Sequence, residues 1–292
     1  MRKLGVVMAA GLVAAASALA QQQVSEKRPA SRDGLVEVHN VSGSVKVLGW
    51  DRDEVEVTGT LGRGTDRLEF TGSGSTTRIK VVLPQHSHNV DGSDLEVHVP
   101  AGSRVEVNTV SATIDADKVT GPLRLESVSG GIAAAGNPRE VEAKTVSGEV
   151  SVSAVAAPVR ARSVSGELTL TGLTGRVDAS SVSGKVVVKG TRFTEAELET
   201  TSGDIRFDGD LAKDASLRAK SMSGTVELAL PPDAAADYEV STFSGSIANE
   251  LGPEAKRTSE YGPGRELSFS TGGGGARVAV SSFSGSVRLR KR

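Results

Sequence analysis

Apolar and polar residues recur along this chain in one repeated pattern, and "SVSGEL" at residues 163–168 is one copy of it. Apolar residues lie two and four positions after the glycine and five and seven positions before it, with polar residues between them. Such alternation with a period of two predicts strands, so each repeat should hold two short strands joined by a sharp bend. The predicted bend glycines are Gly43, Gly130, Gly148, Gly166, Gly184, Gly203, Gly224, Gly245 and Gly285, and Ala112 takes the same position in one further repeat.

Most repeats follow one another after 18 to 21 residues, which is too short for a unit that contains a helix. Repeats of this kind stack as coils, and each strand then pairs in parallel with its copy at a spacing of ~4.8 Å. The sequence therefore predicts an all-β, single-stranded parallel β-helix, or β-solenoid, of about ten coils. The handedness rule for parallel crossovers favours a right-handed coil.

The predicted solenoid domain covers residues 35–292. Within it, residues 105–292 should form the regular coils. Residues 54–104 break the period but still alternate, so they are expected to be irregular strands that cap one end. The final interval between bend glycines is 40 residues, and it is expected to hide a degenerate repeat near "GPGRELSFS" at residues 262–270.

The first twenty residues have the composition of a secretory signal peptide. A short basic start precedes an apolar run, and small residues follow before a predicted cleavage between Ala20 and Gln21. The alternative is a membrane anchor that is never cut. Residues 21–34 are expected to be a flexible linker. The protein is therefore predicted to be exported to the periplasm, the cell surface or the medium, with no transmembrane segment after cleavage.

Composition excludes several classes of protein. The formal net charge is −2, without the basic excess of a nucleic-acid-binding protein. The chain has no cysteine, which excludes disulfides, thiolate metal sites and a lipid-modified cysteine. The sequence points to no cofactor.

The bends contain two ladders of hydroxyl side chains. The position before the glycine is serine in all ten repeats, and the position three before it is serine or threonine in nine. Stacked hydroxyls bond along the column or to the bend backbone, and an enzyme needs a catalytic serine only once. We therefore interpret the ladders as structural. The position two before the glycine becomes bulkier towards the C-terminus, from valine to methionine and phenylalanine, which suggests a widening coil.

Three stretches resemble the DUF4097 β-strand-repeat proteins, a bacterial family of adhesin-like envelope proteins. These stretches are "VEVHNVSGSVKVLGWDRDEVEVTG" at residues 36–59, "LEVHVPAGSRVEVNTVSA" at residues 95–112, and the recurring "SVSGEL" units. The resemblance implies a single-stranded β-helix in the cell envelope, and it carries no catalytic residues to transfer.

An outward polar face is the predicted binding surface. It consists of Glu149, Ser151, Glu167, Thr169 and Lys185, which alternate with the predicted core of the strands that follow the bends. Such a face suits a glycan or protein partner, although an ordinary solvated face has the same composition. Charges six positions before the glycine alternate in sign over several coils, which predicts ion pairs between stacked neighbours.

Two further segments have a possible chemistry. His86, His88 and Asp91 offer nitrogen and carboxylate ligands for a divalent metal, or they form an ordinary polar turn. The C-terminal "VRLRKR" would bind an anionic envelope partner such as lipopolysaccharide, or its charges would protect the last open strand edge from further pairing.

Together these features predict an exported, non-enzymatic repeat protein that acts as an adhesin or as a structural or binding module of the cell envelope. Its partner would be an envelope protein or a glycan. A self-associating scaffold or stress-sensing partner protein, joined end to end, is the alternative. An enzyme acting on polysaccharides is a third hypothesis, which would depend on Asp115 and Asp117.

Overall fold

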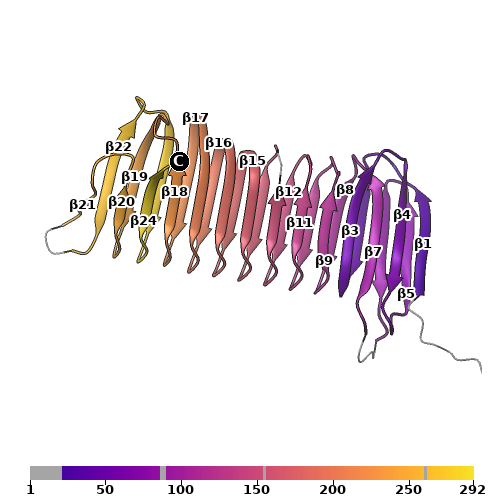
Figure 1. The fold of residues 1–292 in the computed structure, drawn as a ribbon. Helices are drawn as coiled ribbons and strands as arrows, with labels where there is room; N and C mark the ends of the chain where they lie inside the picture. The colour runs from indigo at the N-terminus through magenta and orange to yellow at the C-terminus, as the bar shows by residue number, and fades with distance from the viewer. Residues whose placement is uncertain (1–21, 86–89, 154–155, 260–261) are drawn as a thin grey trace, which may run out of the picture.

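The computed structural model describes residues 22–85, 90–153, 156–259 and 262–292. Within these ranges every regular element is a β-strand, which confirms the all-β prediction. Figure 1 shows an elongated stack of strands with the N-terminal part at one end and the C-terminal part at the other. Among the described residues, no helix has the length and apolar character that crossing a membrane requires.

The middle of the stack repeats one unit, a pre-bend strand followed by a post-bend strand. The pre-bend strands are β8 (Arg104–Thr109), β10 (Leu123–Ser127), β12 (Val141–Thr145) and β14 (Val159–Ser163). The post-bend strands are β9 (Thr113–Asp117), β11 (Ile132–Ala135) and β13 (Val150–Ser153). Each strand pairs in parallel with its copy in the next repeat, so that Leu123 lies opposite Val141 and Ile132 opposite Val150.

Three long strands continue the stack. They are β15 (Leu168–Ser181), β16 (Val186–Thr200) and β17 (Ile205–Ser221). Each runs from the post-bend part of one repeat into the pre-bend part of the next, with register shifts where the chain crosses over. Parallel pairing therefore connects the repeats without interruption from β8 to β17.

The core is the space enclosed between the two columns of strands. The predicted apolar columns point into it, and Leu125, Val150 and Val186 are fully buried. Small and branched side chains fill most of the core. In the wider coils towards the C-terminus, Phe193 and Phe207 pack together with ring centroids 5.1 Å apart. The solenoid-like stacking of parallel repeats is thus observed, whereas its right-handedness and the number of coils stay predictions.

The N-terminal end is closed by an inserted segment. The first repeat, β2 (Leu35–Asn40) and β3 (Gly43–Trp50), pairs directly with β8 and β9. The outer strands are β1 (Gln22–Pro29), β4 (Glu54–Leu61), β5 (Arg67–Ser73), β6 (Thr76–Val82) and β7 (Ser93–Pro100). They stack outside the first repeat, with antiparallel pairs between β1 and β4, β4 and β7, and β5 and β6. The structure therefore differs from the flexible linker expected over residues 21–34, because residues 22–29 pair with β4 along their whole length.

The C-terminal end does not follow the order of the sequence. Its strands are β18 (Val226–Leu230), β19 (Ala236–Thr242), β20 (Ile247–Asn249), β21 (Lys256–Arg257), β22 (Arg265–Thr271), β23 (Ala276–Ser282) and β24 (Val287–Lys291). The last repeat, β23 and β24, lies between β17–β18 on one side and β19–β20 on the other. In chain order the outer repeat, β19 and β20, comes before the last repeat, although the last repeat lies inside it in the stack.

Two expectations are wrong at this end. Residues 262–270 do not form a degenerate coil, because β22 pairs antiparallel with β19. The C-terminal strand is not an open edge, because β24 pairs on both sides. Its arginines form ion pairs with neighbouring coils instead. Arg290 lies 3.2 Å from Glu227, and Arg292 lies 3.1 Å from both Asp208 and Asp210.

A buried charge tests the position of the core. We expect Val150→Asp to lower the free energy of unfolding by about 3–5 kcal/mol, because a carboxylate would be buried without a partner. Ser151→Asp is the matched control, since Ser151 is exposed on the adjacent position and its replacement should change stability by less than about 0.5 kcal/mol. Urea unfolding followed by circular dichroism measures both. Equal effects of the two substitutions would contradict the alternation.

Candidate functional site

Six of the bends are held by a hydrogen bond inside the repeat. The hydroxyl three positions before the glycine points inward and accepts a hydrogen bond from the glycine N–H. In the repeat around Gly166, the Ser163 Oγ is 2.7 Å from that nitrogen. Five further bends share this bond, at Gly130, Gly148, Gly184, Gly203 and Gly285. The inner hydroxyl ladder is therefore structural, as interpreted from the sequence.

The glycines allow consecutive bends to approach one another. A Cβ atom on Gly166 would lie 1.7 Å from the carbonyl oxygen of Gly148, and one on Gly148 would lie 1.9 Å from that of Gly130. These glycines do not have a left-handed backbone, so the requirement for glycine comes from the neighbouring coil. Only Gly43 and Gly224 among the bend glycines have a positive φ, 102° and 143°.

The close approach predicts a sharp difference between two adjacent glycines. Gly130→Ala should lower the free energy of unfolding by about 1–3 kcal/mol, because its Cβ would fall 1.9 Å from the Ala112 oxygen. Gly131→Ala should be tolerated, since the nearest atom to its Cβ would be the Glu149 oxygen at 3.7 Å. Denaturant unfolding of the two variants measures the difference. A Gly131 variant as unstable as the Gly130 variant would disprove the spacing between bends.

The inner hydroxyls predict a second difference. Ser163→Ala should cost about 1–3 kcal/mol, because the buried N–H of Gly166 would lose its acceptor. Ser221 lies in the same column, but its buried hydroxyl has no hydrogen-bond partner among the described residues. Ser221→Ala should therefore leave the unfolding midpoint unchanged or raise it. Thermal unfolding of both variants tests this. A Ser221 variant whose unfolding midpoint falls as far as that of the Ser163 variant would contradict it.

The residue after the inward hydroxyl points towards solvent in each bend, and together these residues form an apolar column. We call the ten residues two positions before the nine bend glycines and Ala112 the bend ridge. In spatial order they are Val41, Val110, Val128, Val146, Val164, Val182, Thr201, Met222, Phe283 and Phe243. Nine of them are large apolar residues with 36–59% exposure, and they are all the exposed large hydrophobic residues in the described part of the chain.

Backbone bonds make the bend ridge continuous. The serine that follows each ridge residue donates its N–H to the ridge carbonyl of the preceding coil, as from Ser165 to Val146 at 2.9 Å. The same bonds follow the inserted last repeat, from Ser284 to Met222 and from Ser244 to Phe283. The rings of Phe243 and Phe283 stack with centroids 4.9 Å apart and planes within 9°. At ~4.8 Å per coil, the ten bends extend over about 45 Å, and Figure 1 shows them as a row along the lower edge of the stack.

Charged side chains cover the outer face of the pre-bend strands, beside the bend ridge. Arg160 and Asp178 pair across neighbouring coils at 3.0 Å, as the alternating signs predict. Lys144 contacts Glu142 at 2.5 Å and Glu126 at 3.4 Å. Its hydrogen bond to the Glu142 carboxylate is the main reason why the pKa of Glu142 lies below its usual range. This face compensates its own charges and so supports the stack.

The predicted polar face lies on the other side of the bend ridge. Glu149, Ser151, Glu167 and Lys185 are exposed, and Thr169 is half-buried. The five side chains stand on consecutive post-bend segments, because Val150 pairs with Leu168 and Leu168 with Val186. The structure thus brings them onto one face, and their role in binding stays a prediction.

The predicted metal site lies largely outside the described residues and stays a prediction. His86 and His88 lie outside them. Asp91 pairs with Arg63, at 2.6 Å between the carboxylate oxygen and Nε. In the ranges that the structure describes, no three histidine, aspartate or glutamate side chains come together to hold a metal ion.

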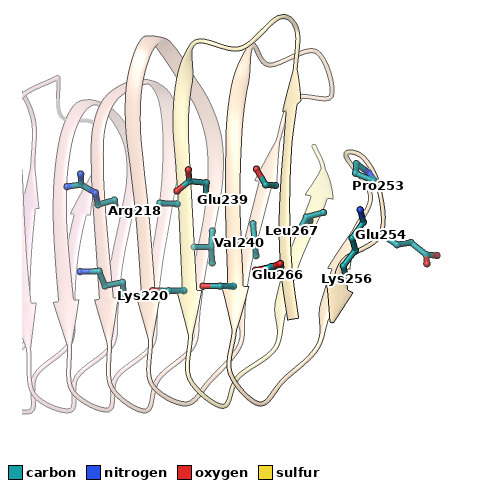
Figure 2. A pocket seen from close by; sticks show the side chains of 14 residues that line it. Arg218, Lys220, Glu239, Val240, Pro253, Glu254, Lys256, Glu266 and Leu267 are labelled. Carbon is teal, nitrogen blue, oxygen red and sulfur yellow. The ribbon is translucent and has the colours of Figure 1, made fainter. Parts of the chain in front are cut away.

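A hollow of about 770 Å³ lies at the C-terminal end. Figure 2 shows Arg218 and Lys220 on one side of it and the segment of Pro253, Glu254 and Lys256 on the other, with Glu239 between them. Its floor is the outer face of β17, β23, β19 and β22. Arg218 and Glu239 belong to the column of alternating charges, so the hollow collects charges of both signs rather than one.

The bend ridge is the surface that sequence reasoning missed. Its column is visible in the sequence as six valines followed by larger residues, a pattern that by itself suggests only a widening coil. Alternation alone places this column outward, because the hydroxyl before it points inward. Combining the two observations would have found the exposed apolar edge.

The fold and the bend ridge define a class, an all-β repeat protein of solenoid-like form with one exposed apolar edge. Residues 163–290 match the family described as Toastrack DUF4097. The resemblance to this family that the sequence predicts is therefore confirmed over these residues. None of the curated proteins compared with the chain is a match.

Several solved structures are similar to the chain. A "putative adhesin" from Parabacteroides distasonis ATCC 8503 has 14% identity and a TM-score of 0.44, covering 92% of this chain and 97% of its own. A second "putative adhesin", from Bacteroides fragilis NCTC 9343, has 10% identity and a TM-score of 0.36, covering 93% and 98%. A "putative lipid binding protein" from Parabacteroides distasonis ATCC 8503 has 15% identity and a TM-score of 0.39, covering 92% and 96%.

Proposed function

We propose that this protein is an exported, non-enzymatic binding module of the cell envelope, adhesin-like in its action, and that the bend ridge is its binding surface. The observation that carries the proposal is the placement of all exposed large apolar side chains of the described residues in one column. Soluble proteins rarely expose contiguous apolar patches beyond a few hundred Å² unless another surface covers them.

The shape of the bend ridge suits a long partner surface. It runs along the whole stack, whereas a site for a small molecule is concave and local. Outward serine hydroxyls border it, and several of them bond back to the ridge carbonyls, as Ser111 does to Val41 at 3.2 Å. These polar groups are therefore already satisfied, so apolar contact would supply the affinity.

The cellular location in this proposal depends on the sequence. The predicted signal peptide supports export, and the envelope location is what the sequence resemblance to this family implies. An extended contact along the bend ridge would serve either adhesion or the assembly of an envelope scaffold, and both are binding functions of the same edge.

Binding to isolated envelope fractions tests the proposal. The ridge variant combines Val146→Thr, Val164→Thr and Val182→Thr, which keep the side-chain shape and follow the threonine already present at Thr201. We expect its affinity for envelope fractions to fall at least tenfold, because three exposed methyl groups become hydroxyls that must be dehydrated on contact.

The control variant removes the charges of the predicted polar face. It combines Glu149→Gln, Glu167→Gln and Lys185→Gln, and it should bind like the unaltered protein. Sedimentation of labelled protein with the envelope fractions measures all three affinities. If only the control variant lost binding, the binding surface would be the polar face. If neither variant lost binding, the bend ridge would not be the site.

A further inference from the structure

We propose that the partner of the bend ridge is a second copy of this chain. The two copies would pack edge to edge, with their long axes antiparallel about a two-fold axis perpendicular to both. This inference rests on the proposed function, in which the bend ridge is the binding surface. It is supported by the area of the edge, by the gradient of side-chain size along it and by the charges beside it.

The edge is large enough for a stable dimer. A strip about 45 Å long and ~20 Å wide, the thickness of two packed sheets with their outer side chains, has on the order of 900 Å². Standard protein interfaces cover about 800 Å² on each partner. Because both ridges repeat with the same ~4.8 Å period, every ridge side chain can meet one of the other copy along the whole contact, as identical ladders do in dry interfaces between sheets.

Side-chain size favours the antiparallel arrangement. Counted in spatial order, positions 1 to 6 of the bend ridge are valine, and positions 8 to 10 are Met222, Phe283 and Phe243. A two-fold axis between positions 5 and 6 sets position 1 against position 10 and position 3 against position 8. Each large side chain then meets a valine of the other copy. Parallel packing would set the aromatic rings against each other and hold the valine ends apart.

The charges beside the bend ridge agree with the same axis. The column two residues before each ridge position carries Glu126 at position 3, Lys144 at position 4, Glu199 at position 7 and Lys220 at position 8. The two-fold axis sets position 3 against 8 and position 4 against 7. Glu126 of one copy then meets Lys220 of the other, and Lys144 meets Glu199. Symmetry doubles these to four contacts, all between opposite charges.

The remaining members of this column introduce no like-charge contact. The axis sets His39 against Ser241, Asn108 against Ser281, and Arg162 against Ser180. On the other side of the ridge, Glu167 meets Lys185 with opposite charge, whereas Glu149 meets Asp204 with like charge. These contacts offset each other, and the control variant described above removes both kinds. The Asp204 carboxylate already accepts a hydrogen bond from the Thr225 N–H at 2.7 Å, which draws one of its oxygens towards its own chain.

Two hollows lie along the same side of the ridge as these charges. One of about 550 Å³ is lined by Val182, Thr201, Met222 and Phe283, which are positions 6 to 9. One of about 240 Å³ is lined by Val128 and Val146 at positions 3 and 4, with Glu126 and Lys144. The antiparallel axis sets the first hollow of each copy against positions 2 to 5 of the other, so each ridge would enter a hollow of its partner.

A charge exchange tests the arrangement in the full-length exported protein. Variant one combines Glu126→Lys with Lys144→Glu, and variant two combines Glu199→Lys with Lys220→Glu. Each reverses one intramolecular ion pair, of 3.4 Å and 3.1 Å respectively, and variant one also loses the pairs of Glu126 with Arg124 and of Lys144 with Glu142. In each variant alone, all four contacts between the copies become like-charge contacts. In a mixture of the two, all four become opposite-charge contacts again.

We expect the unaltered protein to sediment as a dimer in analytical ultracentrifugation. Each variant alone should dissociate with at least a tenfold higher dissociation constant, and the equimolar mixture should return to the original value through heterodimers. Unchanged unfolding midpoints of both variants would show that the fold is intact. Dimers unaffected by either variant, or weakened without rescue on mixing, would overturn the antiparallel arrangement.

The same measurements separate this inference from the proposed function. The unaltered protein could be a monomer at 100 µM while the ridge variant still loses binding to envelope fractions. In that case the partner is not a second copy, but the bend ridge is still the binding surface. If the protein forms dimers that dissociate in the ridge variant and in both charge variants, with rescue on mixing, the second copy is supported. If the ridge variant changes neither property, both proposals fail.

Discussion

The contact between consecutive bends is the constraint on which the rest of this structure depends. At Gly166 a Cβ atom would lie 1.7 Å from the oxygen of the bend below it, and several other bends show nearly the same overlap. Parallel strand pairing fixes the spacing of the coils, so no room for a side chain remains at this point. Most coils therefore place a glycine, an inward hydroxyl and an outward ridge residue in the same way, and the bend ridge is continuous because the bends are nearly identical.

The middle of the fold could be predicted from the sequence because its information is local and repeated. A residue such as Val150 is inward in every arrangement that keeps the alternation of its strand, and it pairs with its copies on both sides. The order of the last repeats could not be predicted in this way. β23 and β19 carry the same apolar columns, so β17 could pair with either of them. The choice depends on β22, which pairs antiparallel with β19 and closes its outer side.

At the candidate site, the apolar residue type alone gives the wrong placement. Val146 and Val164 are apolar like the core residues, yet they are exposed. The hydroxyl side chain before each of them points inward to the glycine N–H, so the valine itself points outward. The alternation around the inward hydroxyl separates this apolar column from the four buried ones. The outward residues Glu149 and Glu167 were easier to place, because simple alternation puts them on the surface.

The two ends of the bend ridge differ because the last repeat is inserted between earlier ones. A ladder of identical valines would have no preferred register, since a shift by one coil would reproduce the same contacts. The inserted last repeat brings Phe283 between Met222 and Phe243, so that the three largest ridge side chains are neighbours at one end. The same insertion closes the stack with antiparallel strands, as β1 and β4 to β7 do at the other end. Both ends thus depart from the repeat while the long edge keeps it, and the edge acquires a polarity. That polarity allows a surface built from repeats to recognise one partner in one orientation.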